Sequence, residues 1–412
     1  MHPFTLLFLA MLALSVAVEA WLARRQARHV AAHRDTVPAA FSQRVTLAEH
    51  RKAADYTVAR VRLGRVHLAI GTVVLLAWTL GGGVAALDAV WRDLLGPGLA
   101  AGVALLVSAL LIGVVIELPL SLWKTFRLEA RFGFNRTTPR LFVLDTLKSL
   151  GLMLALTTPL AWAALALMAQ AGTAWWAWLW ALWLGFNLLL VWAWPRFIAP
   201  LFNRFTPLED TALRARIDAL LERTGFASKG LYVMDGSRRS AHGNAYFTGL
   251  GRHKRIVFFD TLLEGLEPVE VEAVLAHELG HFRRHHVTWR LASGALLSLA
   301  GLALLGWLVE QPWFYTGLGV AVPSDAAALL LFALALPAFT TLLTPIGAWL
   351  SRRHEFQADA FAREHSDADA LVRALVKLYR DNASTLTPDP LHSAFHDSHP
   401  PAPVRIARLE HG

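Results

Sequence analysis

Seven long apolar runs divide the chain and alternate with polar segments that are rich in arginine. Each run has about 20 residues or more, which lets a helix cross about 30 Å of hydrocarbon. No small-residue cleavage site precedes Arg24, so we interpret the first run as a retained span rather than a signal peptide. The pattern predicts a polytopic membrane protein with about seven spans. The runs lie at residues 3–22, 66–90, 98–121, 147–170, 175–198, 289–311 and 325–350.

The polar stretch between the fifth and sixth runs has the pattern of a folded, water-exposed region. Residues 208–223 place apolar side chains at helical spacing, whereas residues 230–234 and 255–259 are rich in the β-branched and aromatic residues typical of strands. Residues 240–248 fit either another strand or an extended edge. The chain therefore predicts a mainly α membrane protein whose helices are capped by an α+β domain.

The capping domain is expected to consist of two segments that flank the last two apolar runs. We expect an N-terminal membrane region of about five helices at 1–198 and the first part of the capping domain at 199–288. Two further membrane helices follow at 289–350, and the second part of the domain occupies 351–412. The final stretch, 386–412, is rich in proline and histidine.

Composition supports an integral membrane protein in contact with a lipid bilayer. Hydrophobic residues make up 55% of the chain, charged residues 17%, and the mean hydropathy is +0.42. The absence of cysteine leaves histidine and carboxylates as metal ligands. The net charge of +8 does not require a nucleic-acid partner, because basic residues beside spans are the usual signal of membrane topology.

Frequent Ala, Arg and Leu with few Lys indicate a GC-rich bacterial genome, and hence a bacterial inner membrane.

The distribution of basic residues predicts the orientation in the membrane. With seven spans, the segments 23–65, 122–146, 199–288 and 351–412 fall on one side, and they hold nearly all lysines and arginines. The short connections on the opposite side contain a single basic residue, Arg92. Because cytoplasmic segments carry the positive charge, we expect the N-terminus outside and both the capping domain and the C-terminus in the cytoplasm.

The strongest chemical signal is His277-Glu278-Leu279-Gly280-His281, which matches the pattern H-E-x-x-H. Residues four apart lie on one face of a helix, so both imidazoles can reach one metal ion. Glu278 then falls beside the metal, where it can accept a proton from a bound water. The alternative is a pair of surface histidines on a solvated helix face.

A third ligand is expected just after the last span, where Glu355 and Asp359 are also four residues apart. In a site built from two histidines and a glutamate, Glu355 completes the ligands and Asp359 hydrogen-bonds a ligand histidine, which we expect to be His277. The alternative is a membrane-proximal helix on which Arg352 and Arg353 pair with these acids.

A three-histidine site is excluded, because the extended pattern needs glycine and histidine where the chain has Arg284 and Val287. We interpret His285 and His286 as interfacial residues near the mouth of the next span. His354 adjoins Glu355 but points about 100° away on a helix, so we do not expect it to be a ligand.

Taken together, these motifs resemble the CAAX prenyl proteases of type I, which are integral-membrane zinc metallopeptidases. The resemblance covers almost the whole chain, and its most specific stretch is Gly133-Phe-Asn-Arg-Thr-Thr-Pro139. The other matching stretches are 118–126, 198–208, 237–249, 277–281, 355–359 and 399–405.

The resemblance implies seven long helices around a large water-filled chamber, capped by a zincin-type domain with one zinc ion (Zn2+) per chain. It implies that His277, His281 and Glu355 are the zinc ligands and that Glu278 is the general base. The substrate is then a peptide or protein, including lipidated or membrane-anchored forms. Family members of this type remove the C-terminal tripeptide of prenylated proteins.

The resemblance also implies two further groups of site residues. An edge strand, formed by Asn244, Ala245, Tyr246 and Phe247, would hold an extended peptide through main-chain hydrogen bonds. His399 and Arg405 match tail residues near the active site, where a donor would stabilise the oxyanion. The alternative for His399 is a solvated tail residue.

Two other functions stay open from the sequence. One is a quality-control metalloprotease that degrades damaged membrane proteins, for which we expect fewer spans and no stretch like residues 133–139. The other is a non-enzymatic scaffold or channel that retains zinc, which the intact Glu278 disfavours. Few acidic residues in the later runs disfavour an ion-coupled transporter. If the source is bacterial, prenylated CAAX substrates need not be the physiological ones.

Overall fold

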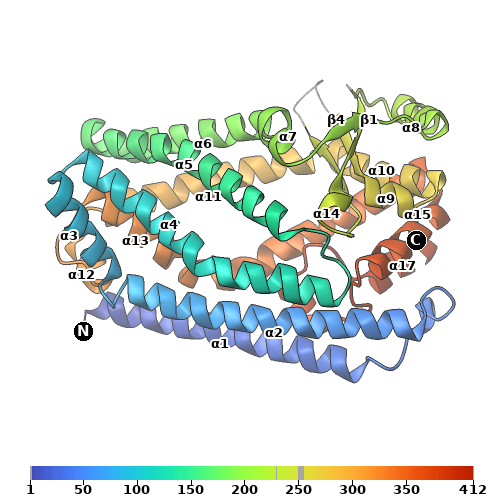
Figure 1. The fold of residues 1–412 in the computed structure, drawn as a ribbon, viewed down its shortest axis with the longest axis horizontal. Coiled ribbons are helices and arrows are strands. Elements are labelled where there is room, and N and C mark those ends of the chain that lie inside the picture. Colours follow the sequence, from blue (N-terminus) through green and yellow to red (C-terminus); the bar gives the residue numbers. More distant parts are fainter. Residues whose placement is uncertain (1, 229, 249–254, 412) are drawn as a thin grey trace.

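Long helices run side by side along most of the molecule, and a small sheet with several shorter helices lies at one end (Figure 1). The computed structural model describes residues 2–228, 230–248 and 255–411. Within these residues, seven helices are long and apolar enough to cross a membrane, which confirms the predicted number. The candidate spans are Pro3–Ala32, Leu47–Trp78, Leu99–Glu129, Pro139–Gln170, Gly172–Phe202, His286–Leu308 and Asp325–His365.

The second span differs from the predicted run at 66–90, because the run joined two separate helices. Helix α2 (Leu47–Trp78) begins far earlier, where the side chain of Thr46 accepts a hydrogen bond from the backbone of Glu49 and the Glu49 side chain bonds back to Thr46. It ends before three consecutive glycines. The second of these, Gly82, has a left-handed φ of 78° and precedes the short helix α3 (Gly83–Leu95).

Several spans continue beyond the apolar runs as rods that reach the capping domain. Helix α1 (Pro3–Ala32) extends ten residues past the predicted end, and α13 (Asp325–Thr340) passes through a short turn into α14 (Thr344–His365). Because α14 leaves the membrane without a break, the segment around Glu355 is held on a rigid helix. The remaining long helices are α4 (Leu99–Trp123), α5 (Pro139–Gln170), α6 (Trp175–Ala193) and α11 (His286–Leu308).

The spans pack most closely at the end of the molecule that is opposite to the sheet. There, apolar side chains of α1, α4, α5, α11 and α13 form one cluster with the short helix α12 (Pro312–Gly317). Two hydrogen bonds reinforce it: the hydroxyl of Thr5 donates to the carbonyl of Gly317, and that of Ser15 to the carbonyl of Ala338, each at 2.8 Å. The enclosed chamber that the family resemblance implies stays a prediction.

The sheet has four short strands in the order β1-β2-β4-β3. Strands β2 (Leu231–Met234) and β4 (Arg255–Phe259) are parallel and occupy the two predicted strand positions. Strand β3 (Ala245–Thr248) pairs antiparallel with β4 and lies at an edge of the sheet. Residues 240–248 were predicted to form either a strand or an extended edge, and their second half forms this strand. The three-residue strand β1 (Phe205–Pro207), antiparallel to β2, was not predicted.

Shorter helices cover the sheet and build the core of the capping domain. Helix α8 (Thr211–Arg223) starts later than the apolar pattern indicated, because the side chain of Asp210 accepts the backbone N–H of Leu213 and caps it there. The core joins segments on both sides of the last two spans. Its other helices are α9 (Asp260–Gly265), α10 (Pro268–Arg283), α15 (Ala368–Asp381) and α17 (Ala402–His411), and α16 (Pro390–His396) and α7 (Ala199–Phe202) lie nearby.

Candidate metal centre

Helix α10 carries the H-E-x-x-H motif and is fixed at both its start and its buried face. Pro268 occupies the first turn, and Glu267 and Glu270 form a reciprocal capping box. Two acids of this helix are almost fully buried and paired: Glu270 with Lys377 at 2.7 Å and Glu272 with Arg216 at 2.5 Å. These bonds tie α10 to α15 and α8, so the motif sits on an immobilised scaffold.

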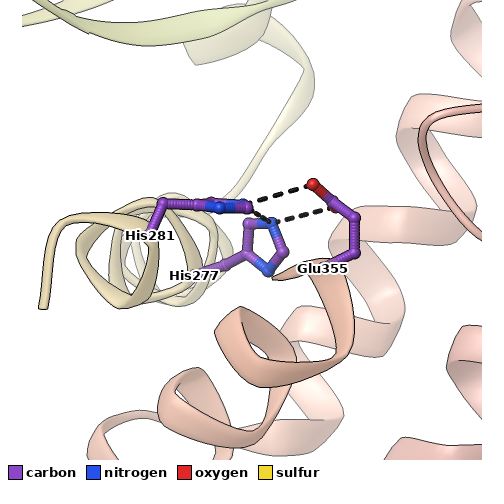
Figure 2. A group of neighbouring side chains, drawn as sticks. All are labelled: His277, His281 and Glu355. Atoms are coloured by element: carbon purple, nitrogen blue, oxygen red, sulfur yellow. Dashed lines mark hydrogen bonds and ion pairs between the residues drawn. The ribbon is translucent and has the colours of Figure 1, made fainter. Parts of the chain in front are cut away.

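His277 and His281 of α10 point toward Glu355 of α14 (Figure 2). The Nε2 atoms of the two histidines are 3.3 Å apart, and they lie 3.4 Å and 3.3 Å from the two carboxylate oxygens of Glu355. A tetrahedral ion with bonds of 2.0–2.1 Å, the length that zinc makes to imidazole, separates its ligand atoms by about 3.3 Å. The three side chains therefore have the spacing of a metal site.

A buried carboxylate oxygen without a hydrogen bond supports the same conclusion. Glu355 is 3% exposed, and its Oε2 atom accepts no hydrogen bond from the described residues, although Nε2 of His277 and Nη1 of Arg405 lie 3.4 Å and 3.7 Å away. The pairing with neighbouring arginines that we considered does not occur. Instead, Arg352 donates to the carbonyls of Ser393 and Asp397, and the guanidinium of Arg353 lies over the ring of Trp349. A cation among the three ligands would satisfy the free oxygen.

Asp359 lies behind His277, where the sequence placed it. Its Oδ1 atom is 2.8 Å from Nδ1 of His277, which leaves Nε2 facing the metal position. Burial lowers the pKa of the His277 imidazole. The interactions with Asp359 and Glu355 raise it by a larger amount, so that the pKa is about 9. A metal at this position would compete with a proton for His277, so zinc affinity should fall as the pH is lowered.

Arg405 of α17 is buried beside Asp359, at the border of the cavity that contains Glu278. Its Nε atom donates to Oδ2 of Asp359 at 2.9 Å and its Nη2 atom to Oδ1 at 2.5 Å, and Nη1 is 3.7 Å from Glu355. Only 6% of the residue is exposed. The geometry favours a clamp that holds the acidic partners of the metal ligands over the oxyanion donor that the sequence suggested.

Gly280 allows α10 and α14 to approach closely. A Cβ atom at this position would come within 2.9 Å of the Cα and 3.1 Å of the carbonyl oxygen of Ala358, and within 3.0 Å of Cβ of Phe361. Backbone atoms cannot move aside as a flexible side chain would. The glycine inside the motif therefore sets the distance between the helix with two candidate ligands and the helix with the third.

Replacing Gly280 with alanine is expected to separate these helices and to lower both stability and zinc affinity. Overpacking costs about 1–3 kcal/mol, and the better helix propensity of alanine offsets only about 1 kcal/mol. Thermal unfolding and zinc titration of the purified variant measure the two effects. Gly294→Ala on α11 is the matched control, because its Cβ would meet nothing within 4 Å. Equal zinc affinity in Gly280→Ala and the wild type would contradict this prediction.

Glu278 faces a cavity of about 360 Å³ that also reaches His277 and the start of β3. The residue is half-buried, and no hydrogen bond or ion pair holds its carboxylate among the described residues. Apolar side chains form one wall of the cavity, which limits access of water. A free carboxylate beside the metal ligands is the geometry that a general base requires. The apolar wall consists of Leu262, Val274, Leu371, Leu375 and Leu378.

His399 borders the same cavity from the C-terminal segment. Its Nε2 atom is 3.5 Å from Oε1 of Glu355, yet 63% of the side chain is accessible. Burial among protein atoms lowers the pKa of His399 although Glu355 raises it, so the imidazole is neutral at pH 7 and carries one N–H. It also lines a second cavity of about 490 Å³ that extends to Gln26 of α1 and Arg60 of α2.

The predicted substrate strand lies at the cavity mouth, and its side chains alternate. Asn244 and Ala245 line the cavity. Phe247 packs against Phe282 of α10 with ring centroids 4.9 Å apart, whereas Tyr246 packs against Phe259 of β4. These two rings pack against other residues of the domain. We therefore expect a substrate to contact the main chain of β3 and Asn244, the residue before the strand. The matching stretch ends at Gly249, which lies outside the described residues.

The stretch 133–139 contacts the segment that leads into this strand. The carbonyl of Phe134 accepts the backbone N–H of Ala241 at 3.1 Å, and the Phe134 ring stacks on His242 at 4.3 Å. The His242 ring is also 3.0 Å from Oδ1 of Asn382 and 3.7 Å from Glu129. The sequence analysis named the stretches 133–139 and 237–249 but did not predict these contacts, because the partners come from different segments and have no metal-ligand spacing.

The structure corrects the interpretation of His286. His285 is exposed, but His286 is buried, at 2% exposure, and its Nδ1 atom lies 3.0 Å from Nδ1 of His281. The cause is the left-handed conformation of His285 (φ 58°), which turns the chain between α10 and α11. His354, expected not to be a ligand, stacks on His286 at 4.1 Å.

Known proteins resemble this chain across both its membrane and its capping parts. The model for the CAAX prenyl protease N-terminal region with five membrane helices matches residues 26–204, and that for peptidase family M48 matches residues 207–412. CAAX prenyl protease 1 of Saccharomyces cerevisiae is 35% identical over 316 residues, which cover 73% of this chain and 70% of the relative. The Caenorhabditis elegans homolog is 31% identical over 434 residues, covering 98% and 97%.

A solved structure shows the same arrangement of helices. The crystal structure of S. mikatae Ste24p superposes with a TM-score of 0.90 at 29% sequence identity, and the match covers 99% of both chains. The similarity therefore includes the membrane helices, the sheet and the helices that carry the metal-ligand candidates.

Proposed function

Because the chain belongs to the CAAX prenyl protease group of peptidase family M48, whose members are membrane metallopeptidases, we propose that it is a zinc-dependent endopeptidase. One zinc ion per chain would be held by His277, His281 and Glu355. The observation that carries the proposal is the set of 3.3–3.4 Å separations among their ligand atoms beside the unpaired carboxylate of Glu278.

The chain's own residues supply the other steps of hydrolysis. Zinc, when bound, would lower the pKa of a water in the cavity, so that the water can lose a proton and attack a peptide carbonyl. Glu278 accepts the proton of that water and returns it to the leaving amine. The neutral imidazole of His399, open to the cavity, donates its N–H to the developing oxyanion. Asp359 and Arg405 act indirectly, because they orient His277 and Glu355.

The substrate is an extended peptide held along the edge strand. Main-chain groups of β3, together with Asn244, would pair with the peptide, so that side-chain selectivity is loose. The similarity to proteins named CAAX prenyl protease 1 supports a prenylated C-terminal peptide, and a lipid anchor would enter from the membrane helices. The surplus of Lys and Arg on the side of the sheet supports a cytoplasmic capping domain with the N-terminus outside. The composition, rich in Ala, Arg and Leu and poor in Lys, supports a bacterial inner membrane.

Cleavage of a farnesylated CAAX peptide by the purified full chain tests this function. We expect hydrolysis that stops with a zinc chelator, returns with added zinc, and falls at least tenfold for the same peptide without its farnesyl group. The metal content of each sample is measured in parallel. Equal cleavage of both peptides would favour the broader membrane protease. Bound zinc without cleavage of any peptide would favour the non-enzymatic scaffold.

A further inference from the structure

His286 occupies the first turn of the membrane helix α11, yet its ring lies directly behind a candidate metal ligand. Its Nδ1 atom is 3.0 Å from Nδ1 of His281, and its Nε2 atom is 2.7 Å from Oε1 of Gln357 on α14. These contacts form a chain of three side chains from Gln357 through His286 to His281. They connect α14, α11 and α10 at the boundary between membrane helices and capping domain.

We propose that His286 and Gln357 are positioning residues that fix the tautomer of His281, so that its Nε2 lone pair faces the metal. The amide oxygen of Gln357 can only accept, so Nε2 of His286 must donate to it. A neutral His286 then has its lone pair on Nδ1 and can only accept there. His281 must therefore donate from its own Nδ1, which leaves Nε2 without a proton and free to bind.

The opposite direction is incompatible with the site. If Gln357 presented its NH₂ group, His286 would donate from Nδ1 and His281 would carry its proton on Nε2. That N–H would stand where the metal belongs, 3.3 Å from both His277 and Glu355. Proton positions along the chain are thus coupled, and only one arrangement leaves two imidazole lone pairs beside the Glu355 carboxylate.

The two histidine ligands are supported in different ways. His277 donates to the carboxylate of Asp359, which Arg405 neutralises, whereas His281 donates to a neutral imidazole. Two carboxylates, Glu355 and Asp359, already lie close to the metal position. A neutral partner for His281 orients that ligand without adding a third buried negative charge.

This hydrogen-bonded chain from Gln357 through His286 to His281, hereafter the relay, can be tested without disturbing the substrate cavity. His286, His354 and Gln357 line a separate cavity of about 620 Å³ between α11 and α14, and none of them lines the cavity that contains Glu278. The inference rests on the proposed zinc site. Its main readout is zinc affinity, measured by competition with a chromogenic chelator, and it does not depend on peptidase activity.

His286→Phe keeps a buried ring but removes the acceptor, and we expect zinc affinity to fall about 10–100-fold. His354→Phe changes the stacked neighbouring ring, for which no hydrogen bond to His281 is present among the described residues, and should change zinc affinity less than threefold. Thermal unfolding of the metal-free proteins shows whether each variant is folded. The visible spectrum of the cobalt-substituted protein should change in His286→Phe only, because its ligand set is disturbed.

The direction of the relay has its own test in Gln357. Gln357→Lys offers Nε2 of His286 only a donor, which favours the opposite proton arrangement, and should lower zinc affinity about tenfold or more. Equal zinc affinity in wild type, His286→Phe and Gln357→Lys would overturn the inference alone. A wild-type protein that binds no zinc would overturn the proposed function, and the inference with it.

Discussion

Glu278→Gln is expected to lower kcat for peptide hydrolysis by about 10²–10⁴-fold while zinc stays bound. Glutamine has the same shape but cannot accept a proton. The wild-type carboxylate faces the cavity beside His277 and has no ion pair among the described residues, so its loss leaves no charge uncompensated. Stopped assays on the farnesylated peptide give kcat and KM, and metal analysis gives the zinc content. KM should change little, since the substrate is held by β3.

The control for this variant is Glu264→Gln, an exposed glutamate of α9 that lies away from the cavity. It makes the same chemical change and should keep full activity. Full activity in Glu278→Gln would instead assign the base to another group, and His399 would be the next candidate because it borders the same cavity. Loss of zinc in Glu278→Gln would show that the carboxylate helps to hold the metal.

The group of candidate metal ligands that the structure brings together could be predicted from the sequence, because the spacing within each pair is a local property of helices. Residues four apart share a helix face wherever the helix lies. His277 and His281 were therefore expected on one face of their helix, and Glu355 and Asp359 on one face of theirs. What joins the two helices is not local. The close approach at Gly280 depends on Ala358 and Phe361 of a segment that follows two membrane spans.

The missed features depend on single turns and on contacts between distant segments. Left-handed backbone at His285 is uncommon for a residue other than glycine, and it turns the chain at the point where His286 comes to lie against His281. In the second predicted span, α2 ends and α3 begins at a stretch with three consecutive glycines inside an apolar run. The mean hydropathy of the run stays high across this stretch, so it does not show the break. The His242–Asn382 contact joins residues 140 positions apart and has no pattern in the sequence.

Arg405→Met is expected to destabilise the capping domain by about 3–5 kcal/mol, because the buried acids Asp359 and Glu355 lose their cation. Arg405→Lys restores the charge but not the two parallel hydrogen bonds to Asp359, so it should recover only part of the loss. Thermal unfolding of metal-free and zinc-loaded protein measures the effect. Zinc should narrow the difference from wild type, since the ion compensates the same carboxylates.

These variants also separate the two roles considered for Arg405. A clamp predicts that unfolding temperature and zinc affinity fall together in Arg405→Lys, and that saturating zinc restores most of kcat. An oxyanion donor predicts that kcat falls about 10²–10³-fold at unchanged stability and unchanged zinc affinity. Arg408→Lys is the matched control, because Arg408 lies on the same helix with its guanidinium over Phe356 and is exposed. The burial of Arg405 and its two bonds to Asp359 favour the clamp, since these bonds engage its Nε and Nη2 atoms.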